Sequence, residues 1–257
     1  MRSCFLFLLL WAWSAGPLQA AETFCYDAPV DKSTLQPVLV DGQCIYGEHT
    51  ARIAGWVLQQ LPQATFVELP WQRCLNEVRA GRIHGLLSIG WTEERASWFA
   101  FPPHAGEQND KLALFDVPYF IYVLQNSTVR WDGQQFQGLQ YGLITFKGYL
   151  AEQRLRELNA LSPLDLDITQ GIDLLLNHRV DGYVIPPGPT AQQFSQHAKF
   201  AQVRQLELPL LQMPLYLAFA KDYCLSSAAV CQQIWQHLAE QRQQWEVAQR
   251  QASANSQ

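Results

Sequence analysis

Positive charge is scarce in this sequence. It has 18 Lys and Arg residues against 23 Asp and Glu residues, which gives a formal net charge of −5. Proteins that bind nucleic acids or anionic membrane surfaces use basic patches for the purpose. The composition therefore argues against both kinds of partner, and we expect no binding of nucleic acid.

Metal-binding and catalytic motifs are missing as well. The histidines are scattered singly and the cysteine spacings fit no zinc pattern. We find no Gly-x-Ser-x-Gly motif and no phosphate-binding loop. Glu48, Glu68 and Glu207 are the acidic residues that we considered as general acids, and none has an evident partner. We therefore expect no cofactor, no metal and no catalytic activity.

Only one long apolar run occurs, at residues 4–13, and no second run is long enough to cross a membrane. A bilayer span needs about 20 apolar residues. Arg2 before the run, Gly16 and Pro17 after it and a small residue at Ala20 are typical of a secretory signal peptide. We expect residues 1–20 to be removed and the protein to be exported to the periplasm. A retained anchor is the alternative.

The cysteines beyond residue 20 suit an oxidising compartment. Cys224 and Cys231 close a short loop before a long helix, and we predict a disulfide between them. Among Cys25, Cys44 and Cys74 one cysteine must be left over, and the sequence does not choose between the possible pairs.

Strand and helix patterns alternate along the first part of the chain. Apolar residues recur at helical spacing in 47–62 and 71–81, and the apolar segments 22–28, 64–70 and 84–90 between them are typical of strands. This βαβαβ order predicts a parallel sheet with helices on its faces.

The pattern then restarts, which predicts a second lobe. We expect helices at 148–158, 171–179, 189–198 and 227–248, and strands at 119–125, 138–144, 164–168, 180–186, 200–206 and 214–222. In open α/β sheets, ligands bind beyond the carboxyl ends of the strands. Two such lobes facing each other would place both sets of strand ends in one cleft.

Residues 70–101, PWQRCLNEVRAGRIHGLLSIGWTEERASWFAF, resemble a segment of extracytoplasmic solute-binding proteins. The resemblance is to the type 2 periplasmic receptors of polar amino-acid ABC transporters (bacterial family 3). GLITFKGYLAEQRL, LLLNHRVDGYVI and PLYLAFAKD follow in that family's order. The resemblance implies an α/β fold of two lobes joined by a two-stranded hinge, with lobe 1 at 21–110 plus 210–248, lobe 2 at 111–209 and a disordered tail at 249–257. It also implies a monomeric receptor that closes on a small solute and serves an ABC permease or a membrane sensor.

The same resemblance implies the binding residues. Arg95 matches the arginine that pairs with a ligand carboxylate, as a planar guanidinium can do through two parallel hydrogen bonds. A surface ion pair of Arg95 with Glu93 or Glu94 is the structural alternative. The other residues that we expect at the site are Ser88, Gly90, Trp91, Thr145, Lys147 and Tyr149. We interpret Trp71 as a core residue and Trp91 as the one that stacks on the solute.

The second lobe departs from the family pattern. Where the family has an aspartate for the ligand's amino group, this sequence has Pro186 and Pro187, which supply neither a carboxylate nor an N–H group. The usual binding of a free amino acid is therefore not expected. An anionic or neutral solute, a peptide-like fragment or a modified amino acid fits better, and we expect the solute to bear a carboxylate. Two alternatives remain open: a degenerate binding fold that serves as a sensory or protein-interaction module, and a dehydratase-type enzyme on the same scaffold.

Overall fold

The computed structural model describes residues 21–255 except 28–31, 33–34, 108–109 and 165–169. The predicted signal peptide lies outside the described residues, as does most of the strand predicted at 164–168. Among the helices that are described, none combines the length and the apolar character needed to span a bilayer.

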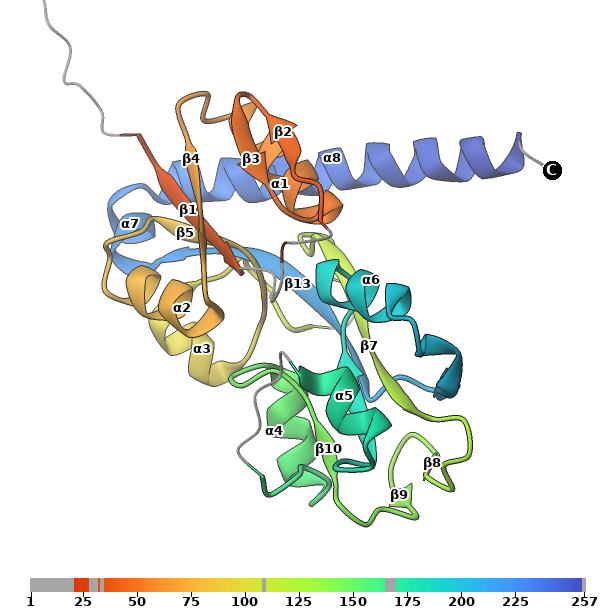
Figure 1. Ribbon diagram of the computed structural model, residues 1–257. Helices are drawn as coiled ribbons and strands as arrows, with labels where there is room; N and C mark the ends of the chain where they lie inside the picture. The colour runs from red at the N-terminus through yellow and green to blue at the C-terminus, as the bar shows by residue number, and fades with distance from the viewer. Residues whose placement is uncertain (1–20, 28–31, 33–34, 108–109, 165–169, 256–257) are drawn as a thin grey trace, which may run out of the picture.

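Two lobes make up the molecule (Figure 1). In lobe 1, β1 (Thr23–Asp27) lies between β4 (Thr65–Leu69) and β5 (Gly85–Gly90) and is parallel to both. Helices α1 (Glu48–Leu58) and α2 (Trp71–Arg79) connect these strands, as the sequence predicts. The core packs around Phe24, Val57 and Leu87 on one side of the sheet and around Cys74, Val78 and Ile89 on the other.

Lobe 2 is built on the same plan. β10 (Leu143–Ile144) is parallel to β11 (Gly182–Ile185), and α4 (Leu150–Glu157), α5 (Gly171–Leu176) and α6 (Pro189–Gln196) pack around them. Its two cores centre on Ile121 with Leu155 and on Tyr183 with Phe194. Only part of the strand predicted at 200–206 is extended, because residues Phe200–Gln202 form a 3-10 turn before β12 (Val203–Gln205).

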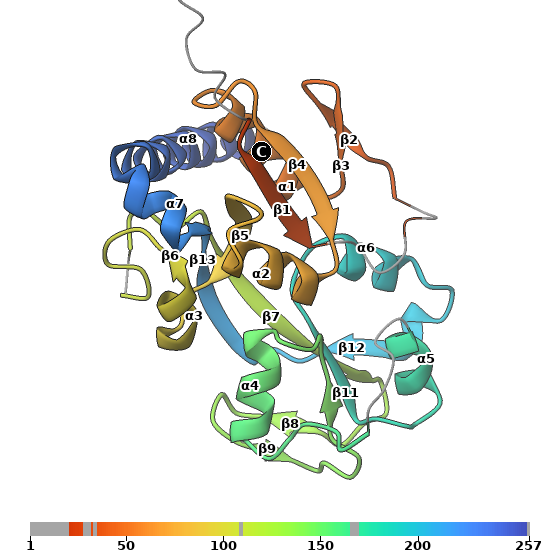
Figure 2. The same cartoon turned by 90° about the vertical axis from the view of Figure 1, so that its left-hand side faces the viewer.

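Two long antiparallel strands join the lobes. β7 (Phe115–Leu124) and β13 (Leu211–Ala220) pair over residues 115–119 and 211–215, and each also pairs with strands of a lobe. The result is one continuous sheet in the order β10-β11-β7-β13-β5-β1-β4, and Figure 2 labels the strands from β11 to β4. Leu114 packs in the lobe 1 core and Leu210 in the lobe 2 core, so the chain changes lobe within these strands.

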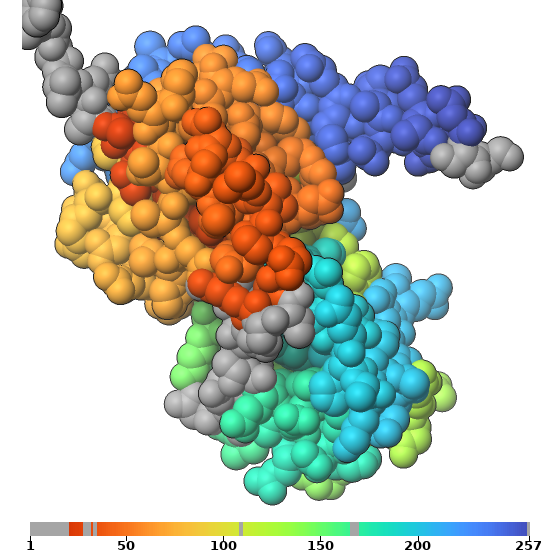
Figure 3. Space-filling model, turned by 45° about the horizontal axis from the view of Figure 1, so that its top comes forward, coloured from red at the N-terminus to blue at the C-terminus, as the bar shows by residue number. Residues whose placement is uncertain are grey.

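The final helix differs from the prediction. α8 (Ala228–Ala254) continues through most of the tail expected to be disordered and projects past lobe 1 (Figure 3). Residues 249–254 contain no Gly or Pro to end it. At its base, Cys224 in α7 (Lys221–Ser226) is bonded to Cys231, as predicted. Of the three cysteines that the sequence left unpaired, Cys25 and Cys74 form a disulfide, and Cys44 is an exposed free cysteine.

Several short elements in the described part of the chain were not predicted. A hairpin of β2 (Val38–Val40) and β3 (Gln43–Ile45) stands outside the main sheet. A second hairpin, β8 (Arg130–Trp131) with β9 (Phe136–Gln137), is held by stacked aromatic rings. α3 (Glu93–Trp98) and β6 (Phe99–Ala100) follow β5 directly. Elements this short do not show a hydrophobic period along the sequence.

Candidate functional site

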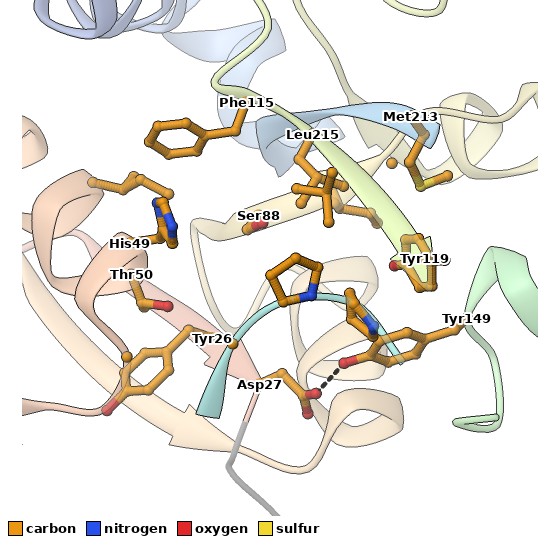
Figure 4. A pocket seen from close by; sticks show the side chains of 18 of the residues that line it. Tyr26, Asp27, His49, Thr50, Ser88, Phe115, Tyr119, Tyr149, Met213 and Leu215 are labelled. Atoms are coloured by element: carbon orange, nitrogen blue, oxygen red, sulfur yellow. Dashed lines mark hydrogen bonds between the residues drawn. The ribbon is translucent and has the colours of Figure 1, made fainter. Parts of the chain in front are cut away.

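A cavity of about 560 Å³ lies where the two lobes meet. Its walls come from the carboxyl ends of β1 and β5, the start of α1, both crossing strands, and the loops before α4 and α6 (Figure 4). This is the place that the strand-end argument predicts. The wall is more apolar than polar, with aromatic rings Tyr26, Tyr46, Trp71, Phe115, Tyr119, Phe146, Tyr149 and Trp245.

Arg95 is buried at this junction, with 8% of its surface exposed, and it lines the cavity. Thr92 caps α3 by accepting a hydrogen bond from the Arg95 backbone N–H at 3.1 Å, which fixes the helix that carries the guanidinium. Nη1 of Arg95 donates to the Gly90 carbonyl at 2.8 Å, and Nη2 of Arg95 donates to the Gly148 carbonyl at 2.9 Å. The surface ion pair is therefore wrong, and the guanidinium instead connects lobe 1 to lobe 2. Burial lowers the pKa of Arg95.

Other hydrogen bonds cross between the lobes beside Arg95. Trp71 Nε1 donates to the same Gly148 carbonyl at 3.2 Å, and the ring of Trp71 lies edge-on to that of Tyr149 at 5.3 Å between centroids. The Tyr149 hydroxyl donates to Oδ2 of Asp27, at the end of β1 (Figure 4). Burial and the Asp27 carboxylate raise the pKa of Tyr149, so the phenol stays protonated and can donate. These contacts hold the lobes in a closed arrangement.

Two glycines permit this close approach. Gly148 has a φ of +76°, in the left-handed region that favours glycine, and an added Cβ would lie 1.8 Å from Nε2 of Gln72 in α2. At Gly90 an added Cβ would lie 2.8 Å from Met213 Sδ and 3.0 Å from Leu150 Cδ1. A side chain at either position would separate surfaces that now touch.

The predicted site residues divide into two groups. Ser88, Gly90, Arg95 and Tyr149 line the cavity, and Figure 4 shows Ser88 on its lobe 1 wall. The lining does not include Trp91, Thr145 and Lys147.

Each of those three has another environment. Trp91 lies against Gly106, where an added Cβ would be 2.3 Å from the indole. The Thr145 hydroxyl donates to the Val184 carbonyl at 2.8 Å, inside lobe 2, and the Lys147 side chain is exposed. Trp71, which we interpreted as a core residue, lines the cavity in place of Trp91.

The other end of the cavity contains residues that sequence reasoning missed. His49 at the start of α1 lies edge-on to Phe115 of β7, with 4.9 Å between ring centroids, and Phe115 lies 5.8 Å from Trp245 of α8. Burial, and to a lesser degree Arg52, lower the pKa of His49. No local signal marks these residues, because they come from elements far apart in the sequence.

Lobe 2 closes the remaining side with a wall of prolines. Pro186, Pro187, Gly188 and Pro189 line the cavity between β11 and α6. An added Cβ at Gly47, before α1, would lie 3.3 Å from Pro189 Cγ, so the lobes also touch here. No group of His, Cys, Asp or Glu side chains within the described ranges could hold a metal ion.

Comparison with known proteins supports the fold. No family model and no curated protein matches the chain. Among solved structures, it resembles the amino-acid ABC transporter substrate-binding protein AbpA from Streptococcus pneumoniae bound to L-arginine, with a TM-score of 0.60, 15% identity, and 89% of this chain and 90% of that chain covered.

Two further structures resemble the chain to the same degree. The GluR0 ligand-binding core from Nostoc punctiforme with L-glutamate has a TM-score of 0.60 at 14% identity, covering 87% of this chain and 96% of that one. A putative ABC transporter binding component from Wolinella succinogenes with lysine has a TM-score of 0.58 at 14% identity, covering 88% and 94%. The chain thus has the two-lobed α/β fold of type 2 periplasmic binding proteins.

Proposed function

We propose that this chain is a receptor that encloses one small solute between its two lobes, and that it acts by binding rather than by catalysis. The observation that carries the proposal is the cavity of about 560 Å³ whose walls come from both lobes. Such a volume suits a metabolite-sized ligand. Solved structures of the same fold contain arginine, glutamate and lysine.

The finer parts of the proposal follow from the fold and the sequence. The receptor acts in the periplasm after removal of residues 1–20, and it delivers its solute to an ABC permease that recognises the closed lobes. Ser88, Gly90 and Tyr149 are the predicted residues that we retain as solute contacts, and Arg95 lines the same cavity with its guanidinium bonded to both lobes. Asp27, His49, Trp71 and Tyr119 join them because they line the same cavity. The sequence alone suggested a carboxylate-bearing solute.

A thermal-shift screen of the mature chain tests the receptor function. A solute at about 100 times its dissociation constant should stabilise the protein by about 2.7 kcal/mol. Amines, amino acids, organic acids, sugars and short peptides should each be represented. Saturation at one solute per chain in calorimetry, lost when Gly90→Leu pushes against Met213 and Leu150 and separates the lobes, would support the function. A chain that binds no solute of any class would contradict it.

One observation favours a second function. The groups at the lobe junction already bond to one another, so the closed arrangement does not depend on a solute for every contact. A degenerate fold that serves as a sensory or protein-interaction module would have this property. Scattering of the purified chain distinguishes the two functions, because a module of this kind stays closed and unresponsive in every solute of the screen.

A further inference from the structure

Some of the donors that would suit a solute carboxylate are already bonded to the protein. Both terminal nitrogens of Arg95 donate to backbone carbonyls, one in each lobe. The indole N–H of Trp71 shares the second of those acceptors. The two bonds of Arg95 use two of the five N–H groups of the guanidinium, so a carboxylate bound by Arg95 would share it with both backbone carbonyls.

The helices that begin at the cavity each have a feature that weakens anion binding at the N-terminus. Helix N-termini attract anions through their unbonded N–H groups. At α4 the Gly148 N–H already donates to Oε2 of Glu152 at 2.6 Å. At α6 the first residue is Pro189, which has no N–H group, and at α1 the first residue is Glu48, an anion itself.

Acidic side chains outnumber basic ones along the cavity. Asp27 lies within it, and Glu48, Asp116 and Glu246 lie at the end formed by α1, β7 and α8. Two of these also face a cation outside the lining: Glu48 lies 3.5 Å from Arg52 and Glu246 lies 3.6 Å from Arg242. Arg95 is the one Lys or Arg in the described lining, and the lowered pKa leaves His49 neutral at pH 7.

The walls are also suited to a cation. Trp71, Tyr119 and Tyr149 surround the Asp27 end, and Phe115 and Trp245 form the other end. The faces of such rings attract ammonium and guanidinium groups by their quadrupoles, and more strongly where water is excluded. Aromatic walls with interspersed carboxylates are unfavourable to an anion and favourable to an amine.

On these grounds, and resting on the receptor function proposed above, we propose that the solute is an organic cation without a carboxylate group, an amine or guanidine with an apolar body. Asp27 is the carboxylate that faces its charge, and the Tyr149 hydroxyl from lobe 2 holds that carboxylate in place. The class differs from arginine and lysine, which two of the solved structures contain, by the missing carboxylate alone, so it can be tested with matched compounds.

Calorimetry with pairs of compounds that differ only in the carboxylate is the direct test. Agmatine with arginine, cadaverine with lysine and tyramine with tyrosine are suitable pairs. For every pair in which either member binds, we expect the amine to bind at least about tenfold more tightly, which corresponds to 1.4 kcal/mol. An amino acid that binds as tightly as its amine, or an organic acid that binds while amines do not, overturns the cation assignment and leaves the receptor function intact.

Three variants test whether Asp27 supplies the negative charge that binds the cationic solute. Asp27→Asn should weaken binding of the preferred amine at least about tenfold, because the neutral amide keeps the shape and loses the charge. Tyr149→Phe keeps the carboxylate and should keep the preference for the amine within each pair. Glu93→Gln makes the same change in charge at an exposed site outside the cavity and should alter nothing. Full amine affinity in Asp27→Asn overturns the role of Asp27, and a chain that binds no solute at all overturns both proposals.

Discussion

Replacing Arg95 with alanine should open the lobes without unfolding them. Of the two hydrogen bonds made by the guanidinium, the one to Gly90 lies within lobe 1 and persists in an open form. The one to Gly148 exists only when the lobes meet. A hydrogen bond to a charged group contributes about 1.5–3 kcal/mol, so losing the second bond should lower the ratio of closed to open molecules roughly tenfold to 150-fold.

The lower part of that range is the more realistic expectation. Opening returns water to the guanidinium, and recovery of its hydration offsets part of the bond that is lost. Arg95→Lys keeps the charge but lacks the planar fork that reaches both carbonyls, so its closed fraction should be intermediate. Arg79→Ala is the matched control, since that exposed arginine stacks on Trp98 at 4.2 Å, outside the cavity.

Distances between labels on the two lobes measure the effect. A Cys44→Ser background removes the exposed thiol, and Gln59→Cys with Gln137→Cys places one label on each lobe. Pulsed spin-label spectroscopy should give one short distance for the parent and for Arg79→Ala, and a longer population in Arg95→Ala. An Arg95→Ala distribution that matches the parent, in a protein with unchanged circular dichroism, would refute the argument that this guanidinium links the lobes.

Three further predictions concern stability. Replacing both cysteines of the Cys25–Cys74 disulfide with serine should lower the free energy of unfolding in urea by about 4 kcal/mol. The same replacement at Cys224–Cys231, which closes a shorter loop, should lower it by about 2.5 kcal/mol. Equal losses would contradict the dependence on loop length. The pKa of His49 is lower in the folded protein than in the unfolded chain. The unfolded chain therefore takes up more protons as the pH falls below about 6.5, and the free energy of unfolding declines there. His49→Gln should flatten this decline when unfolding is measured from about pH 7.5 to 5, and an unchanged slope would contradict the prediction. Thr145→Val should lower the free energy of unfolding by about 1 kcal/mol, because the Val184 carbonyl loses its donor. Calorimetry should show an unchanged solute affinity, and a large loss of affinity would indicate that Thr145 contacts the solute.

Local sequence was sufficient for the scaffold of the site. The apolar periods of β1, α1, β4, α2 and β5 predicted parallel strands whose carboxyl ends meet at one edge, and the cavity lies at that edge. Thr92 caps α3 three residues before Arg95, so the position of that arginine beside the end of β5 depends on neighbours in the sequence. Signals of this kind act over a few residues and are readable without the rest of the fold.

The partners of these residues could not be predicted in the same way. Trp91 is only four residues from Arg95 in the sequence, yet it packs against Gly106, and the more distant Trp71 lines the cavity instead. The Thr145 hydroxyl was expected to face a solute, yet the neighbouring strand offers it the Val184 carbonyl. Short-range patterns predict which face of its element a side chain occupies, but not which group of another element packs against it or forms a hydrogen bond with it.

The sequence by itself determined two α/β lobes, a cleft at their strand ends and a guanidinium inside it. Only the tertiary structure decided what that guanidinium bonds to, because its lobe 2 acceptor is a backbone carbonyl and every residue has one. The same holds for the Asp27 carboxylate, which meets the Tyr149 hydroxyl across the cleft, and for Trp245, which α8 carries back over the cavity. The charge and shape of the site result from contacts between distant segments, and these contacts form only when the two lobes come together.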